Sequence, residues 1–182
     1  MKIITHEFIG KIISDIYNFL DETTFIKGCI EPDKNISMIL IPHTKERTLS
    51  NVIEILESNF NSFNLGMVCH YLSDYCCYFH YGSFFFNVLE HYIYERNLHK
   101  IVNSLKITSL VKISKRISAN LINEDYESII NIITTKYRSK KTTMKRDLFY
   151  NYILNLIIFD IYFKRNQLNT NIHNSLYHKA VL

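Results

Sequence analysis

Two pairs of side chains in the first hundred residues have the types and the spacing of metal ligands. His70 and Asp74 lie four residues apart in the stretch CHYLSDYCCYFHYG, and His91 and Glu95 repeat that spacing further along the chain. In a helix, residues four apart lie on the same face, one turn from each other. An imidazole and a carboxylate placed in this way can both bind one zinc or similar divalent ion.

A third histidine lies between the two pairs. His80 follows His70 by ten residues, and in one continuous helix the two would be about 15 Å apart, too far for one ion. Either the helix ends early, or His80 serves a second ion together with His91 and Glu95. The second arrangement gives that ion three protein ligands and an open position for water, as in catalytic zinc sites.

Other ligand-type residues precede these pairs. Asp33 and His43 each follow a proline, and both lie in the segment 21–44. We expect this segment to be a long, ordered, irregular loop. His6 lies at the start of the first expected helix. Each of these features alone is usually structural, as a surface pair, a core histidine or a turn, and only the combination indicates a metal site.

The elements that position these residues are predicted to be helices. The 182 residues include only four Gly and two Pro, and apolar residues recur at helical spacing over long runs. The sequence therefore predicts an all-α fold. About seven helices are expected, at residues 6–20, 48–56, 64–78, 84–103, 108–121, 124–137 and 143–165.

Charge divides the chain into two halves. Residues 1–100 carry a net charge of −4 and residues 101–182 carry +8. An acidic half suits the binding of cations and a basic half suits an anionic partner, although basic side chains can also simply be solvated. We expect a single domain over residues 1–182, with a metal-site half (1–100), a helical continuation (101–166) and a polar tail (167–182).

The four cysteines are expected to be buried packing residues. They lie at positions 29, 69, 76 and 77 and form no CxxC pair, so the common zinc-ribbon and redox spacings are absent. The first twenty residues have neither the pattern of a signal peptide nor that of a transmembrane span. These features predict a cytoplasmic protein with reduced thiols.

The order of these residues resembles that of the bacterial zinc-dependent phospholipase C family. FIKGCIEPD is similar to the GxIxPD segment of that family, and NLGMVCHYLSDYCCYFH is similar to its LGxxxHYLxDxxxxxH segment. The resemblance covers residues 5–96 and implies an all-α fold around two to three zinc ions. The metal ligands that it implies are His6, Asp33, His43, His70, Asp74, His80, His91 and Glu95.

The resemblance also divides these ligands among the ions. It assigns to the first ion Asp33, His43, His70 and Asp74, and to the second His80, His91 and Glu95. A third ion would be held by His6, by Asp74 as a bridge, and by the residue at the amino terminus. Secreted members of the family have a Trp there, whereas this chain has no Trp and five residues before His6. The amine of Met1 is the candidate replacement.

The activity implied by the resemblance is that of a zinc-dependent phosphodiester hydrolase. A metal-activated water would attack a phospholipid head-group phosphodiester, with Asp33 as a ligand and candidate general base. The implied partner is a phospholipid or another phosphodiester. Peripheral contact with an anionic membrane could involve the basic stretch 138–146.

Two other functions remain open from the sequence. A related helical zinc fold makes single-strand nucleases and 3′-nucleotidases, and the basic second half and thirteen tyrosines would also suit nucleic acid. The second open function is that of a helical scaffold that binds metal ions for stability and catalyses no reaction. A phosphohydrolase of the HD type is discounted, because the chain contains no adjacent His-Asp pair.

Overall fold

The computed structural model describes residues 1–18, 21–58, 60–80 and 88–166. No β-strand occurs among these residues, and the prediction of an all-α fold is confirmed. The expected polar tail (167–182) and the first residues of the helix expected at 84–103 lie outside the described part of the chain. No helix within the described residues is long and apolar enough to cross a membrane.

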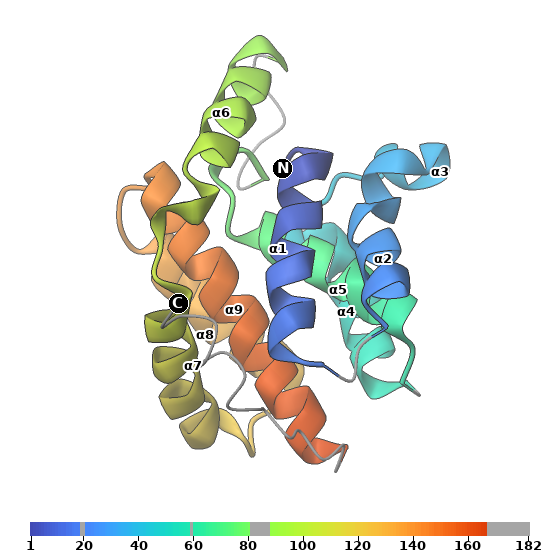
Figure 1. Ribbon diagram of the computed structural model, residues 1–182, viewed down its shortest axis with the longest axis vertical. Helices are drawn as coiled ribbons and strands as arrows, with labels where there is room; N and C mark the ends of the chain where they lie inside the picture. The colour runs from blue at the N-terminus through green and yellow to red at the C-terminus, as the bar shows by residue number, and fades with distance from the viewer. Residues whose placement is uncertain (19–20, 59, 81–87, 167–182) are drawn as a thin grey trace.

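The described residues form nine α-helices and two short 3₁₀ helices, rather than about seven helices (Figure 1). The α-helices are α1 (Ile3–Ile16), α2 (Glu22–Lys34), α3 (Ile36–Ile39), α4 (Lys45–Glu57), α5 (Ser62–Tyr75), α6 (Val88–Lys100), α7 (Ile107–Leu121), α8 (Tyr126–Arg138) and α9 (Met144–Arg165). The 3₁₀ helices are η1 (Tyr78–His80) and η2 (Val102–Ser104).

The prediction of an irregular loop over residues 21–44 was wrong, because α2 and α3 occupy most of it. The Asp21 side chain caps α2 by accepting a hydrogen bond from the Thr24 amide. Pro32 lies near the end of α2, where its missing N–H removes one backbone hydrogen bond without breaking the helix. Apart from the capping residues Asp21 and Asn35, only the short stretch between α3 and α4, which carries His43, remains non-helical.

Two glycines allow α2 and α5 to cross with their backbones in contact. A Cβ atom on Gly28 would lie 2.0 Å from the Phe63 carbonyl oxygen, and one on Gly66 would lie 2.1 Å from the Phe25 carbonyl oxygen. Neither distance is compatible with a side chain, so glycine is required at both positions. Gly28 therefore marks a close helix crossing rather than a position in the irregular loop expected over residues 21–44.

Helix α9 is the centre of the core and joins the two halves of the chain. Its residues are buried almost without interruption from Asp147 to Phe163. It packs against α1 and α5 on one side and against α7 and α8 on the other (Figure 1). Phe159 of α9, for example, contacts the rings of Tyr17 and Phe25. The acidic and basic halves of the sequence thus share one hydrophobic core.

The four cysteines belong to this packed interior. Cys29, Cys69, Cys76 and Cys77 are all buried and all have free thiols. Burial raises the pKa of Cys29, Cys76 and Cys77 above the ordinary value of a thiol, which keeps these three protonated. The expectation that the cysteines are small packing residues is confirmed.

Candidate metal centre

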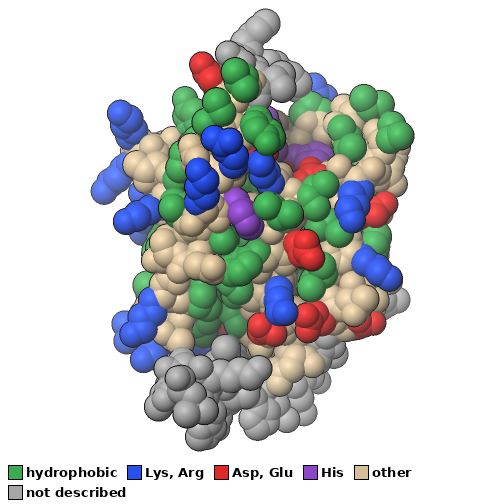
Figure 2. Space-filling model, turned by 45° about the horizontal axis from the view of Figure 1, so that its top comes forward, with side chains coloured by type: hydrophobic (Ala, Val, Ile, Leu, Met, Phe, Trp, Pro, Cys, Tyr) green, Lys and Arg blue, Asp and Glu red, His purple; other side chains and the backbone are tan. Residues whose placement is uncertain are grey.

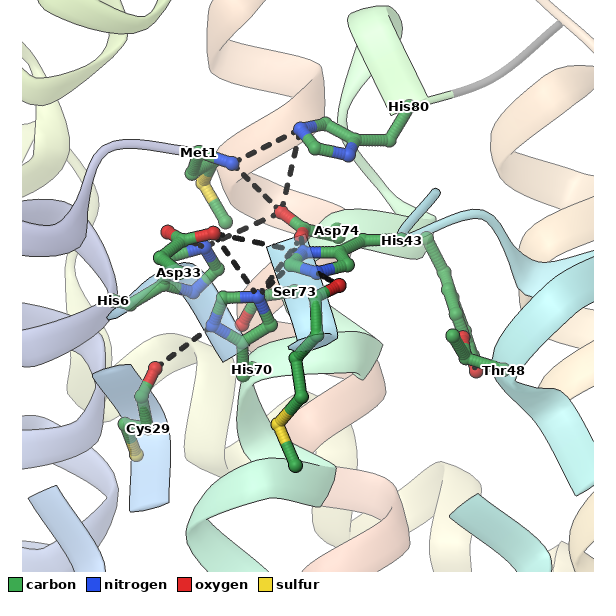
Figure 3. Close-up of polar contacts among 12 residues, drawn as sticks. Met1, His6, Cys29, Asp33, His43, Thr48, His70, Ser73, Asp74 and His80 are labelled. Atoms are coloured by element: carbon green, nitrogen blue, oxygen red, sulfur yellow. Dashed lines mark hydrogen bonds and ion pairs between the residues drawn. The ribbon is translucent and has the colours of Figure 1, made fainter. Parts of the chain in front are cut away.

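The structure brings all eight predicted ligands together at one end of the helix bundle. Their side chains come from α1, α2, α5, η1, α6 and the stretch before α4. Figure 3 shows six of them, His6, Asp33, His43, His70, Asp74 and His80. They form three groups, and within each group ligand atoms lie within 4.8 Å of one another. The inner group is His43, His70 and Asp74; the His6 group is His6, Asp33 and His70; the outer group is His80, His91 and Glu95.

Backbone carbonyls determine which ring nitrogen of each inner-group histidine is available to bind a metal ion. His70 Nδ1 lies 2.8 Å from the Cys29 carbonyl oxygen and must donate a proton to it. His43 Nε2 similarly lies 3.3 Å from the Met38 carbonyl oxygen. In neutral rings these contacts leave His70 Nε2 and His43 Nδ1 without protons, and the two atoms face each other at 3.0 Å.

This arrangement fits a bound cation. Two nitrogen lone pairs aimed at one point repel each other unless a proton or a metal ion lies between them. Two nitrogens bound to one tetrahedral zinc ion are roughly 3.3 Å apart, close to the observed 3.0 Å. Asp74 Oδ2 adds a carboxylate oxygen, 3.2 Å from His70 Nε2 and 3.3 Å from His43 Nδ1.

Asp74 lies where the three groups meet and is fully buried. Besides the inner histidines, its Oδ1 atom lies 3.3 Å from His6 Nε2 and 3.6 Å from His80 Nε2. Burial by itself would raise the pKa of Asp74, but electrostatic interactions with His80, the Met1 amine and His6 outweigh it and hold the pKa well below the ordinary value. Asp74 is therefore an ionised carboxylate that could bridge ions.

His6 is a buried histidine whose ring nitrogens have no hydrogen bond within the described residues. Its ring stacks on His70 at 3.8 Å between centroids, and Nε2 lies 3.8 Å from Asp33 Oδ2. Burial lowers the pKa of His6 well below its ordinary value, so the ring is neutral. A buried, neutral and unpaired imidazole beside two carboxylates has the character of a ligand. It lies inside α1, rather than at the start of the helix as expected.

The outer group forms because α5 ends early. The helix stops at Tyr75 rather than near residue 78, and η1 turns His80 back toward the site. His80 Nε2 lies 3.6 Å from Glu95 Oε1. His91 Nε2 lies 2.7 Å from the same oxygen, but the angle between the two groups does not allow a hydrogen bond. Both possibilities that the sequence left open therefore occur together: an early helix end and a grouping of His80 with His91 and Glu95.

The amine of Met1 lies between the inner and outer groups. It is 2.8 Å from Asp74 Oδ1 and 3.0 Å from His80 Nε2 (Figure 3). It is also 3.1 Å from Glu95 Oε1. Burial by itself would lower the pKa of this amine, but Asp74 and Glu95 outweigh burial and raise the pKa to about 12. The amine is thus a cation placed at the third ligand set that the resemblance implied.

Exposed apolar side chains lie on two elements beside the site, and sequence reasoning missed them. On α3 and just after it, Ile36 and Leu40 are each 78% exposed; on α6, Leu89 is 62% exposed. Figure 2 shows histidine side chains in a recess with hydrophobic side chains around it. The apolar run from Ile36 to Ile41 was the available signal, because it follows no helical periodicity that would bury it.

A comparison with protein families finds a family that depends on zinc. The model of a family described as zinc-dependent phospholipase C matches residues 5–144. The match is most of the chain and extends beyond residue 96, where the resemblance seen in the sequence ended. No curated protein and no solved structure matches the chain significantly.

Proposed function

Because the chain belongs to the zinc-dependent phospholipase C family, we propose that it hydrolyses phosphodiesters at a site of two to three zinc ions, with a phospholipid head group as substrate. The observation that carries this proposal is the convergence of three ligand groups at one end of the bundle. The two ring nitrogens that face each other at 3.0 Å in the inner group, His70 Nε2 and His43 Nδ1, support it most directly.

The proposed ligand sets follow the three groups. The inner group, with Asp33, would hold one ion; the outer group would hold a second; and His6 and Asp74 would hold the third, with the Met1 amine as a further ligand once the ion has displaced its proton. The bound ions would supply a water activated near neutral pH and neutralise negative charge on the phosphate oxygens. Because inner and outer groups adjoin at Asp74, both could act on one phosphate.

Asp33 is our candidate for the general base. Its carboxylate is 20% exposed, in contrast to the fully buried Asp74, so it can reach a substrate or water as well as an ion. Burial, with a contribution from the neighbouring charge of Asp74, raises the pKa of Asp33 above its ordinary value. This direction applies to the metal-free site; bound ions would lower the pKa again and keep the carboxylate ionised, which a general base requires.

Metal content and substrate choice together test this proposal. Protein purified without chelator is expected to contain at least two equivalents of zinc and to hydrolyse a phosphocholine ester, and His80→Gln is expected to remove that activity. His99→Gln, at a histidine outside the three groups, is the matched control. Fewer than two equivalents of metal per protein chain would contradict the proposed site of two to three zinc ions. Cleavage of single-stranded nucleic acid instead would identify a nuclease, and metal binding without either activity would identify a scaffold.

We further propose that the site faces the surface of a lipid bilayer. The exposed residues Ile36 and Leu40 lie on one side of it and Leu89 and Tyr92 on the other. The Lys2 ammonium lies 4.2 Å from the centre of the Tyr92 ring, and this pairing of an aromatic with a basic side chain is common where proteins contact lipid head groups. Apolar side chains at such a surface can insert between lipids while the site meets the head groups.

Substitution of the exposed leucines tests this orientation. Leu40→Ser with Leu89→Ser is expected to weaken binding to phosphatidylcholine vesicles at least roughly tenfold, because each leucine loses apolar contact with lipid. Hydrolysis of a short-chain, monomeric substrate should be unchanged. Ile132→Ser, at a residue 47% exposed on α8, is the control. Equal vesicle binding by all three proteins would rule out this docking face.

A further inference from the structure

Helix α9, whose buried residues are mostly apolar, carries three buried polar residues on one face. Asp147, Asn151 and Asn155 are each four residues apart, and their exposed fractions are 1%, 1% and 0%. At this spacing they form one stripe along the helix. The stripe lies beyond residue 144, where the match to the family ends. Buried polar groups are costly unless they are paired, so their partners indicate what the stripe does.

Asp147 binds three separate elements of the fold. Its Oδ2 atom accepts hydrogen bonds from the Tyr78 amide at 2.9 Å and from the Tyr94 hydroxyl at 2.5 Å. Its Oδ1 atom accepts one from the Tyr137 hydroxyl at 2.9 Å. These donors belong to η1, α6 and α8. One carboxylate of the core helix therefore holds together three segments that are distant in the sequence.

Two of these partners lie directly beside ligands of the outer group. Tyr78 lies two residues before His80 in η1, and Tyr94 immediately precedes Glu95 in α6. The ring of Phe79 adds a second link, because it stacks on His91 at 5.1 Å between centroids. Asp147 thus sets the position of the two chain segments from which all three outer ligands project.

Among the described apolar side chains of α6 that precede Glu95, only Tyr94 packs against the core, and its ring also lies against Phe79. Leu89, Tyr92 and Ile93 are exposed, and the buried Leu98 lies near the C-terminal end of the helix. A segment with so little buried apolar surface is held mainly by its specific polar contacts. The Tyr94–Asp147 hydrogen bond is such a contact, and it lies next to the ligand Glu95.

The other two residues of the stripe bind the segment around Asp74. The Asn151 amide donates to the Ser73 carbonyl oxygen at 3.2 Å and lies 3.7 Å from Met1 Sδ, and the Asn155 amide donates to Ser73 Oγ at 3.1 Å. The stripe therefore contacts the backbone beside Asp74 as well as the segments of the outer group. Asp147 is the only charged residue of the three.

We propose that Asp147 is a positioning residue that holds η1 and α6 at the spacing needed for His80, His91 and Glu95 to bind one metal ion. The inference rests on the proposed metal site and adds a residue outside the family match. Partners that orient metal ligands typically change metal affinity by about 10–100-fold when they are removed. The effect should be confined to the outer ion, because Asp147 has no direct contact with the inner group.

Calorimetric titration of metal-free protein with Zn²⁺ tests this role. In Asp147→Asn, the affinity for the outer ion should fall by about 10–100-fold, while that for the inner ion changes less than about threefold. The His91→Ala protein lacks a ligand of the outer ion, so the isotherm that remains in this variant belongs to the inner ion. Asp160→Asn is the matched control, because Asp160 is a buried aspartate on the same helix that bonds to Ser118 and Lys164 instead.

A pair of tyrosine variants keeps the test valid if Asp147→Asn folds poorly. Tyr94→Phe and Tyr137→Phe each remove one hydroxyl from Asp147, but only Tyr94 adjoins a ligand. Tyr94→Phe should weaken the outer ion and Tyr137→Phe should not. Unchanged outer-ion affinity in both Asp147→Asn and Tyr94→Phe, or an equal loss for both ions, would overturn the inference and leave the proposed function intact. Uptake of only one ion by the unaltered protein would overturn both.

Discussion

The inner and outer groups contain the same kinds of side chains, yet they are built in different ways. His43, His70 and Asp74 are at most 8% exposed and come from segments packed against the close crossing of α2 and α5. In the outer group, His80 and Glu95 are each 13% exposed and His91 is 35% exposed. The inner group is part of the core, whereas the outer group is attached to the core through a few polar contacts.

This difference predicts two ions of unequal affinity. Carbonyl oxygens orient both inner histidines before any metal binds, through Cys29 and Met38. The position of the outer ligands depends on η1 and α6, which meet the core at Asp147. A preorganised site loses less conformational entropy on binding. We therefore expect the inner ion to bind more tightly and to contribute more to stability.

Removal of the metal should have the largest effect. Ions present at about a thousand times their dissociation constant stabilise the folded state by about 4 kcal/mol per site. Chelation should therefore lower the melting temperature strongly in the unaltered protein and in His91→Ala, but much less in His70→Ala. Differential scanning calorimetry with and without chelator measures this. An equal response of the two variants would show that the groups do not differ as described.

The helix crossing gives the next largest effect. Gly28→Ala would place a Cβ atom against the Phe63 carbonyl oxygen, so α2 and α5 must separate. The free energy of unfolding should fall by about 3 kcal/mol, and binding of the inner ion should weaken with it. Chemical denaturation measures the first and metal titration the second.

Gly10→Ala is the control for this prediction. Its Cβ atom would meet the Cys29 Sγ atom at 2.7 Å, and a side chain can move where a backbone carbonyl cannot. The loss of stability should therefore be clearly smaller than for Gly28→Ala. Similar losses for the two variants would mean that the α2–α5 crossing has no special role in the site.

His70→Ala should abolish binding of the inner ion without abolishing binding of the outer ion. The variant removes a ligand shared by the inner group and the His6 group and leaves the buried Cys29 carbonyl without its donor. We expect a loss of about 2 kcal/mol in the free energy of unfolding and no measurable inner ion, with the outer ion retained. Loss of both ions in a Zn²⁺ titration would instead indicate one inseparable cluster.

His91→Ala should have the smallest effect on the fold. Its side chain is 35% exposed, so the free energy of unfolding of the metal-free protein should change by less than about 0.5 kcal/mol. The outer ion should nevertheless be lost from the titration. A stability loss as large as that of His70→Ala would show that the outer group is also part of the core.

The sequence alone was sufficient where local spacing decides the outcome. Helical periodicity predicted the all-α fold, and the four-residue spacing of His70 with Asp74 and of His91 with Glu95 places each pair on one helical face. The burial of the cysteines followed from their type. That the eight side chains bind zinc remains a prediction, although the structure brings them together.

Contacts between distant residues were decided only by the tertiary structure. Gly28 and Pro32 indicated a loop by their local preferences, but the crossing with Gly66 makes Gly28 a packing residue of a helix. The turn of His80 toward Glu95 depends on Asp147, sixty-nine residues from Tyr78. Local propensity carries no information on such pairs, because the free energy that fixes them comes from burial and hydrogen bonds formed only in the folded chain.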